Sequence, residues 1–208
     1  MITLKDLQIN MAVLFSIISI LGLIVAITIH EFSHAFVADR LGDPTARSQG
    51  RLSLNPLRHL DPLGTLMLIF AHFGWGKPVP IDPYNFKNPR RDELLTALAG
   101  PASNILLAIV LSLLFRFLFP SLLKDILYVI IGTNIMLAVF NLLPIPPLDG
   151  SKIFLNLLPL EKSQEWENSL SRYGPVLLLL LVFLPVNGSN IISLIISPII
   201  NFLMNFLT

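Results

Sequence analysis

The sequence predicts an all-α polytopic membrane protein with about five transmembrane helices and a partly embedded, irregular or short β insertion after the first helix. Two observations carry this prediction. The 208 residues are 54% hydrophobic and only 13% charged, with a mean hydropathy of +0.75, whereas a soluble domain carries about 25% charged residues. The apolar residues also fall into separate runs close to the roughly 17–25 residues that a membrane-crossing helix needs. We therefore expect one membrane-embedded domain over 1–208.

The runs set the expected order of elements. The first apolar run continues without a small-residue cleavage site, so it is read as a retained helix rather than a signal peptide. The run near 174–186 is short for a crossing, but Tyr173 to Pro175 can extend it. We expect a core over 11–155, with helices at about 11–38, 93–119 and 125–143, an insertion at 39–92, and C-terminal helices at about 174–186 and 190–207.

The insertion at 39–92 is rich in glycine and proline, which favours irregular backbone. Polar and apolar residues alternate from Arg51 to Leu54, as in a short strand. Irregular backbone at membrane depth is tolerated where it is buried in protein or lines a wet cavity. We therefore expect the insertion to cover such a cavity and to pair edge-on with an unwound substrate. Its apolar run 66–73 is too short to cross easily and is expected to be re-entrant.

The distribution of lysine and arginine decides the topology, because these residues concentrate on the cytoplasmic side of a membrane. If 66–73 does not cross, one side holds 11 of the 14 lysines and arginines, and the other side holds only Lys5, Arg116 and Lys124. If 66–73 crosses, the split becomes 6 against 8. The uneven split is preferred. It predicts an integral membrane protein with its N-terminus outside and the end of the first helix at the cytoplasmic face.

Residues 30–34 read His-Glu-Phe-Ser-His, an H-E-x-x-H pattern at the end of the first apolar run. On a helix, positions i and i+4 share a face, so His30 and His34 can bind one metal ion with Glu31 beside them as general base. Ionisable residues are costly inside a membrane helix and indicate function. A buried structural network of these side chains is the alternative. The chain has no cysteine, so its metal ligands must be His, Asp or Glu.

A catalytic zinc usually has three protein ligands and an open fourth position. The topology requires the third ligand at the cytoplasmic end of helix 125–143, where Asp149 is the acidic residue. Asp149 could also be only a cap or turn residue; Gly150 is expected to permit a sharp turn there. Zinc lowers the pKa of water to about 7, so Glu31 can take its proton for attack on a peptide carbonyl. Asn104 and Asn141 are candidate oxyanion donors, or else interhelical hydrogen-bonding residues.

These motifs resemble the site-2 protease family of intramembrane zinc metalloproteases. The resemblance rests on His30 to His34, on Gly-Pro-Ala-Ser-Asn at 100–104, and on the N-x-x-P-x-x-x-L-D-G pattern at 141–150. It spans roughly residues 20–155, and stretches 50–56, 59–65 and 74–80 look like the small bacterial and archaeal branch without PDZ or CBS domains. The resemblance implies one Zn²⁺ on His30, His34 and Asp149, catalysis by Glu31, and assistance from Asn104 and Asn141.

The resemblance also implies substrates of one kind, the transmembrane segments of membrane-anchored regulators. Two other classes compete with this interpretation: a membrane metal-binding or transport protein, and a helix-binding pseudoprotease. A transporter should spread its acidic and histidine groups along a pathway, whereas here they gather at one depth. The net charge of +1 gives no reason to expect nucleic acid. His59, Asp61 and His72 are left outside the expected metal set, and oligomeric state is not predicted.

Overall fold

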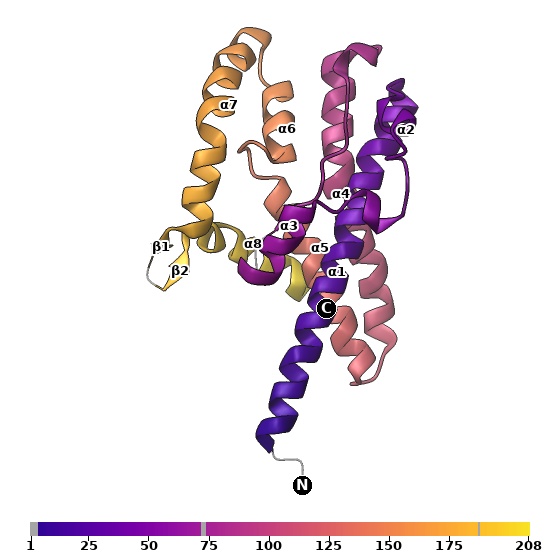
Figure 1. Ribbon diagram of the computed structural model, residues 1–208, viewed down its shortest axis with the longest axis vertical. Helices are drawn as coiled ribbons and strands as arrows, with labels where there is room; N and C mark the ends of the chain where they lie inside the picture. Colours follow the sequence, from indigo (N-terminus) through magenta and orange to yellow (C-terminus); the bar gives the residue numbers. More distant parts are fainter. Residues whose placement is uncertain (1–3, 72–73, 187) are drawn as a thin grey trace.

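Three long helices form the core of the computed structural model, which describes residues 4–71, 74–186 and 188–208. They are α1 (Leu4–Leu41), α4 (Pro89–Phe117) and α5 (Leu122–Asn141), and each packs against the other two. Figure 1 shows all three running close to the long axis of the molecule. Among the described residues, these three helices contain the stretches long and apolar enough to cross a membrane. The protein is therefore an integral membrane protein, as predicted.

Small side chains let the three core helices approach closely. Ala26 and Ala38 on α1, Ala108 on α4 and Ala138 on α5 are all fully buried. Small residues are enriched at membrane helix interfaces because they let two backbones come together. Many large apolar side chains face outward, for example Leu21 on α1 and Leu106 on α4, which are 56% and 62% exposed. The close approach of α1 and α4 is what brings polar side chains of different helices within hydrogen-bonding distance.

The insertion after α1 consists of short helices and turns, not of a strand. It holds α2 (Thr45–Ser48), the 3₁₀ turns η1 (Pro56–Arg58) and η2 (Pro83–Asn85), and α3 (Pro62–Ala71). The expectation of a strand at 51–54 is wrong, because the chain turns there, with Ser53 N donating to Arg51 O. Within the described insertion, extended pairing is limited to the bridge between Leu60 and Gly76. The expectation that the insertion pairs edge-on with a substrate was based on this strand, and the structure does not contain it.

The apolar run at 66–73 lies largely in α3, whose ten residues run from Pro62 to Ala71. A helix of that length rises about 15 Å, roughly half of the ~30 Å hydrocarbon core. It cannot cross as a helix, which agrees with the topology that the charges favoured. His72, which was left unassigned, lies outside the described residues.

The C-terminal third departs most from expectation. α6 (Asp149–Leu157) was not predicted, and α7 (Leu160–Phe183) begins well before residue 174. Two short strands, β1 (Pro185–Val186) and β2 (Ser189–Asn190), pair antiparallel and lead into α8 (Ile191–Leu207).

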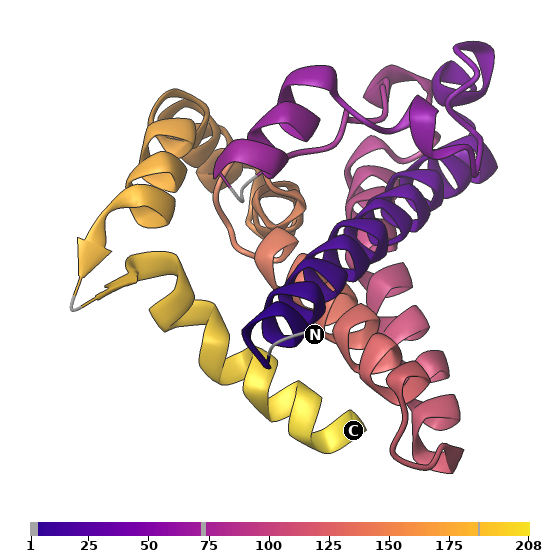
Figure 2. The same cartoon turned by 60° about the horizontal axis from the view of Figure 1, so that its bottom comes forward.

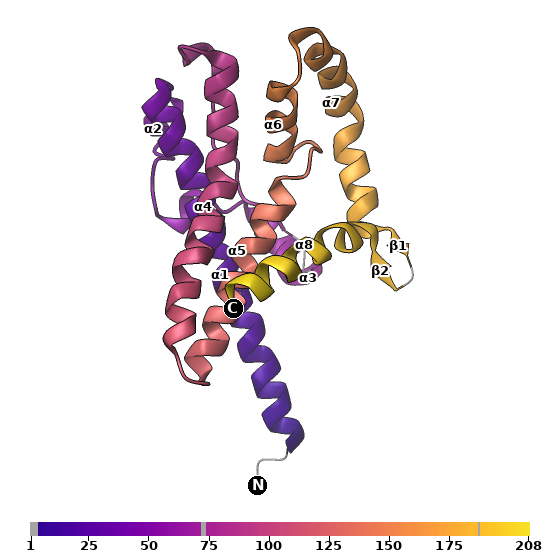
Figure 3. The same cartoon turned by 180° about the vertical axis from the view of Figure 1, so that it is seen from behind.

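The expectation of five transmembrane helices is not confirmed, since three helices of the described chain qualify. The first half of α7 is charged, and α8 is 17 residues long. Figures 1 and 3 show α8 running across the long axis of the molecule. In Figure 2 it extends from the β1–β2 hairpin back toward α5. It packs there through Ile192, Ile196 and Met204, which are buried in the main apolar core.

Candidate active site

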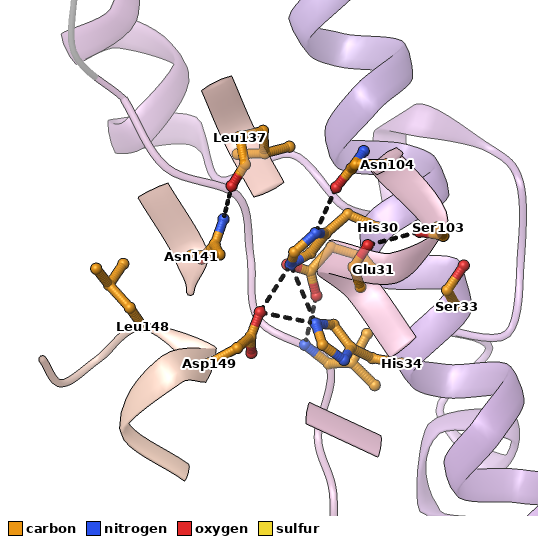
Figure 4. A network of polar contacts seen from close by, with 12 residues as sticks. His30, Glu31, Ser33, His34, Ser103, Asn104, Leu137, Asn141, Leu148 and Asp149 are labelled. Atoms are coloured by element: carbon orange, nitrogen blue, oxygen red, sulfur yellow. Dashed lines mark hydrogen bonds and ion pairs between the residues drawn. The ribbon is translucent and has the colours of Figure 1, made fainter. Parts of the chain in front are cut away.

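His30, His34 and Asp149 meet between α1 and the start of α6 (Figure 4). The Nε2 atoms of the two histidines are 3.0 Å apart. Asp149 Oδ2 is 3.0 Å from His30 Nε2 and 3.2 Å from His34 Nε2. Both histidines are 5% exposed, and the Asp149 side chain is 19% exposed. The structure thus brings together the three residues that the sequence proposed as ligands, although 115 residues separate His34 from Asp149.

Hydrogen bonds on the far side of each imidazole determine which nitrogen faces the cluster. His34 Nδ1 lies 2.7 Å from the carbonyl oxygen of Thr96, which can only accept. His30 Nδ1 lies 2.7 Å from Asn104 Oδ1, and Asn104 Nδ2 donates to Ala26 O, which fixes the amide orientation. A neutral imidazole has a single N–H, so in both histidines the proton sits on Nδ1 and Nε2 presents a lone pair.

The arrangement of the three facing atoms fits a metal ion. Two imidazole lone pairs and a carboxylate oxygen repel one another at 3.0–3.2 Å unless they share a cation. Zinc bonds of about 2.0–2.1 Å to nitrogen and oxygen give a ligand–ligand edge of about 3.3 Å in a tetrahedron. Gly100 leaves room for the ligands, because a Cβ there would lie 2.3 Å from His34 Nε2 and 2.6 Å from His30 Nε2. In the described chain, these three residues form the one His/Asp/Glu cluster able to hold a metal.

The support behind His30 extends into α5. Asn104 Nδ2 also donates to Asn134 Oδ1 at 3.0 Å, and Asn134 Nδ2 donates to the carbonyl of Ile130 in its own helix. Asn104 and Asn134 are fully buried. Fully satisfied networks of this kind fix side-chain orientation, and the outer partner of a metal-binding histidine sets its tautomer. The network links α1, α4 and α5 at the depth of His30.

Asp149 is placed by the way α6 begins. A Cβ on Gly150 would lie 2.3 Å from the carbonyl oxygens of Leu142 and Leu143. Gly150 is helical, and the positive-φ glycines are found elsewhere in the described chain. Its role is therefore close packing of α6 against the end of α5, rather than the sharp turn that the sequence suggested. At the other end of α6, Arg90 of α4 donates to the carbonyls of Asn156 and Leu155.

The carboxylate of Glu31 contacts the insertion. Its Oε2 accepts a hydrogen bond of 3.0 Å from the backbone N–H of Val79. Gly76 lies near the other oxygen, since a Cβ there would make an ordinary 3.8 Å contact with Glu31 Oε1. Side chains from this turn of α1 therefore contact different segments. The two histidines contact α4 and α6, and the carboxylate of Glu31 contacts residues 76–79.

The two candidate oxyanion donors differ in geometry. Both N–H bonds of the Asn104 amide are used, toward Ala26 and Asn134, so the structure favours Asn104 as the partner that orients His30. Asn141 is half-buried and donates to the carbonyl of Leu137 in its own helix (Figure 4).

Sequence reasoning did not find the Thr96 carbonyl or the Val79 N–H, because backbone groups leave no residue-type signal. It also passed over Asn134, although an asparagine within an apolar helix is such a signal. Two of the three residues left outside the expected metal set have structural partners: His59 Nε2 bonds to Ser53 O, and Asp61 accepts from Gly64 N.

The sequence of this chain is similar to those of known proteins. A model of peptidase family M50 matches residues 119–181. The chain is 38% identical over 192 residues to YwhC of Bacillus subtilis (strain 168), covering 88% of this chain and 85% of YwhC. It is 34% identical over 151 residues to MJ0611 of Methanocaldococcus jannaschii, covering 69% and 72%. It is 36% identical over 146 residues to Rip2 of Mycolicibacterium smegmatis, covering 64% and 54%. All three relatives carry the names of candidate zinc metalloproteases. No solved structure matches.

The fold and the site together define a polytopic membrane protein with a buried His-His-Asp cluster and an adjacent glutamate. The chain belongs to peptidase family M50, the site-2 protease family, and is a metalloprotease.

Proposed function

We propose that this metalloprotease is an intramembrane zinc endopeptidase that cuts membrane-anchored regulatory proteins in or near their transmembrane segments. The observation that carries the proposal is the convergence of two imidazole lone pairs and one carboxylate oxygen beside α1, a helix apolar enough to cross the membrane. In this proposal His30, His34 and Asp149 hold one zinc ion. The names of the relatives support zinc as the metal.

The proposed chemistry assigns a role to each side chain. A bound zinc ion acts as a Lewis acid, which acidifies water and polarises a peptide carbonyl at neutral pH. Glu31 accepts the proton of the attacking water and returns it to the leaving amine, as a general base and then a general acid. Asn104 and Thr96 hold the histidines with Nε2 toward the cluster. Asn141 remains the proposed donor to the oxyanion that forms on the substrate carbonyl.

The apolar surface of the core helices and the distribution of charge support a site within the membrane. The outer surface of α1, α4 and α5 is apolar, so the bilayer surrounds the site and a substrate segment reaches it from within the membrane. Counting lysines and arginines supports an outside N-terminus, which puts the cluster near the cytoplasmic face of a prokaryotic plasma membrane.

Reconstituted proteolysis tests the central claim. Wild-type protein and the Glu31→Gln variant are placed in liposomes with a single-span substrate, and zinc content is measured for both. We expect the variant to retain about one zinc per chain and to lose cleavage by at least a thousandfold. Glu167→Gln, at an exposed position on α7, serves as a control that cleaves normally. Equal cleavage by wild type and Glu31→Gln would remove Glu31 from the mechanism.

Topology has its own test, because the natural chain contains no cysteine. Single cysteines at Arg91, at the start of α4, and at Leu123, at the start of α5, report the two sides of the membrane. In intact cells, a membrane-impermeant maleimide should label the cysteine at 123 and spare the cysteine at 91. The reverse pattern would contradict the proposed orientation.

A further inference from the structure

Residues Gly76–Pro80, called here the 76–80 strap, lie directly over Glu31. Four contacts seat this segment. Gly76 forms an antiparallel bridge with Leu60, and Lys77 N donates to His59 O at 2.7 Å. Lys77 O accepts from Arg51 Nη2 at 2.6 Å, and Val79 N donates to Glu31 Oε2 at 3.0 Å. The strap is therefore fixed on one side to the insertion and on the other side to α1.

Two prolines leave Val79 as the backbone donor to Glu31 in this stretch. Proline has no backbone N–H, so between residues 78 and 80 the only backbone donor is that of Val79. The Val79 side chain is buried and packs with Ala35 and Ala46. Glu31 and Ala35 are four residues apart and share a face of α1. The N–H and the side chain of Val79 thus engage the same stripe of α1, one turn apart.

Arg51 contributes a buried positive charge to the same place. Its residue is 6% exposed, and its guanidinium is electrostatically attracted to Glu31. Its Nε is buried without a hydrogen-bond partner in the described part of the chain. Burying a guanidinium is costly unless an anion or acceptors compensate it. The carbonyl of Lys77 accepts from the guanidinium, and the negative charge of Glu31 acts on it electrostatically, so Arg51 links the strap to the surroundings of Glu31.

We propose that Val79, through its N–H, and Arg51, through its charge and its bond to Lys77, are positioning residues for Glu31. The strap holds Oε2 and fixes the carboxylate, which leaves Oε1 as the oxygen that receives the proton. This inference rests on the proposed function, in which Glu31 is the base. A base displaced by about 1 Å costs on the order of a hundredfold in rate, so releasing Oε2 lowers kcat.

Hydrogen exchange tests the contact without any cleavage assay. Because Pro78 and Pro80 lack amides, a peptide covering the strap reports few amides besides that of Val79. We expect the Val79 amide to exchange at least tenfold faster in Glu31→Ala than in wild type. Ser33→Ala is the matched control on α1, since Ser33 donates only to its own helix at Ile29 O, and it should exchange like wild type. Equal exchange in wild type and Glu31→Ala would overturn the proposal.

Kinetics test the positioning role itself. Val79→Pro removes the N–H, whereas Val79→Ala keeps it and only trims the side chain. We expect Val79→Pro to lower kcat at least tenfold below Val79→Ala, with KM and zinc content unchanged. Loss of zinc together with kcat, or equal kcat for the two variants, would overturn the role.

A second pair of variants covers the case in which Val79→Pro fails to fold. Arg51→Met removes charge and donors at similar size, and Arg51→Lys keeps both a charge and a donor. We expect the kcat of Arg51→Lys to be at least tenfold higher than that of Arg51→Met at equal zinc content. Equal kcat for these two variants would exclude Arg51 from positioning Glu31. If wild type did not cleave the substrate, but the Val79 amide still exchanged faster in Glu31→Ala than in wild type, the result would count against the proposed function and not against the contact between Val79 and Glu31.

Discussion

The two sides of the H-E-x-x-H turn are built in different ways. On the ligand side, His30 and His34 are held by Asn104 and Thr96, which stand on a long core helix. On the insertion side, Glu31 is held by a backbone N–H in a segment with little regular structure of its own. The histidines thus depend on helix packing, and the glutamate depends on a loop that other loop residues seat. The difference teaches that metal binding and proton transfer should respond separately to mutation.

The largest effect on zinc binding is expected at Gly100, on the ligand side. A methyl group there would lie 2.3 Å from His34 Nε2 and would occupy the space of the ligands. Gly100→Ala should therefore lose zinc binding and cleavage together, each by more than a hundredfold, as measured by zinc titration and proteolysis in liposomes. Gly132→Ala on α5 is the matched control, because its Cβ would make only an ordinary 3.6 Å contact with Met204. Normal zinc affinity in Gly100→Ala would contradict the placement of the metal.

The two asparagines should separate binding from catalysis. Asn104→Ala removes the acceptor that orients His30, and loss of such a partner typically costs 10–100-fold in metal affinity. Asn141→Ala should leave zinc affinity unchanged and lower kcat by about 10²-fold, as for a lost oxyanion donor. Zinc competition titrations and kcat measurements on both variants check this. Equal losses of zinc affinity in the two variants would contradict the assignment of Asn104 to metal binding and Asn141 to catalysis.

A smaller effect is expected at Arg90, which supports the ligand side from a distance. Arg90→Ala frees the terminal carbonyls of α6 and should lower the free energy of unfolding by about 1 kcal/mol. Because α6 carries Asp149, zinc affinity should also fall by a few fold. Arg91→Ala, at the exposed neighbouring position, is the control. Thermal unfolding with and without zinc measures both quantities, and identical behaviour of the two variants would contradict the prediction.

The smallest effect concerns the insertion side and depends on pH. The carboxylate of Asp43, just after α1, is buried and accepts hydrogen bonds from Thr45, Asn85 and the Asp82 N–H. Burial alone would raise the pKa of Asp43, but these hydrogen bonds together lower it. The folded pKa is below the unfolded value of about 3.9, so the stabilisation is complete above that value and is lost as pH falls through the folded pKa.

Asp43→Asn should therefore be less stable than wild type by about 1 kcal/mol at pH 7. The gap in Tm should narrow as the pH falls below the unfolded pKa of about 3.9. Glu167→Gln, exposed on α7, should show no such pH-dependent gap. A gap between Asp43→Asn and wild type that stays constant as the pH falls from 7 to well below the unfolded pKa of about 3.9 would show that the charge of Asp43 does not stabilise the insertion.

The sequence by itself determined the membrane helices of the core, the histidine pair and the acidic residue that joins them. The helices and the histidine pair depend on local quantities: run length, the period of 3.6 residues, and the cost of ionisable groups in an apolar helix. Asp149 depends in addition on the topology set by the lysines and arginines. The sequence misplaced the start of α7, because charged and apolar residues there form one continuous helix. It also predicted a strand at 51–54 where Arg51 instead turns inward to reach Lys77.

Only the tertiary structure decided how the site is held. The Thr96 carbonyl, the Asn134 amide and the Val79 N–H come from segments distant from the H-E-x-x-H turn. Backbone donors and acceptors exist at nearly every residue, so a sequence cannot show which of them reaches a given side chain. Long-range packing selects them, and at this site it gives the histidines a rigid support from α4 and α5 and gives Glu31 a support from the strap.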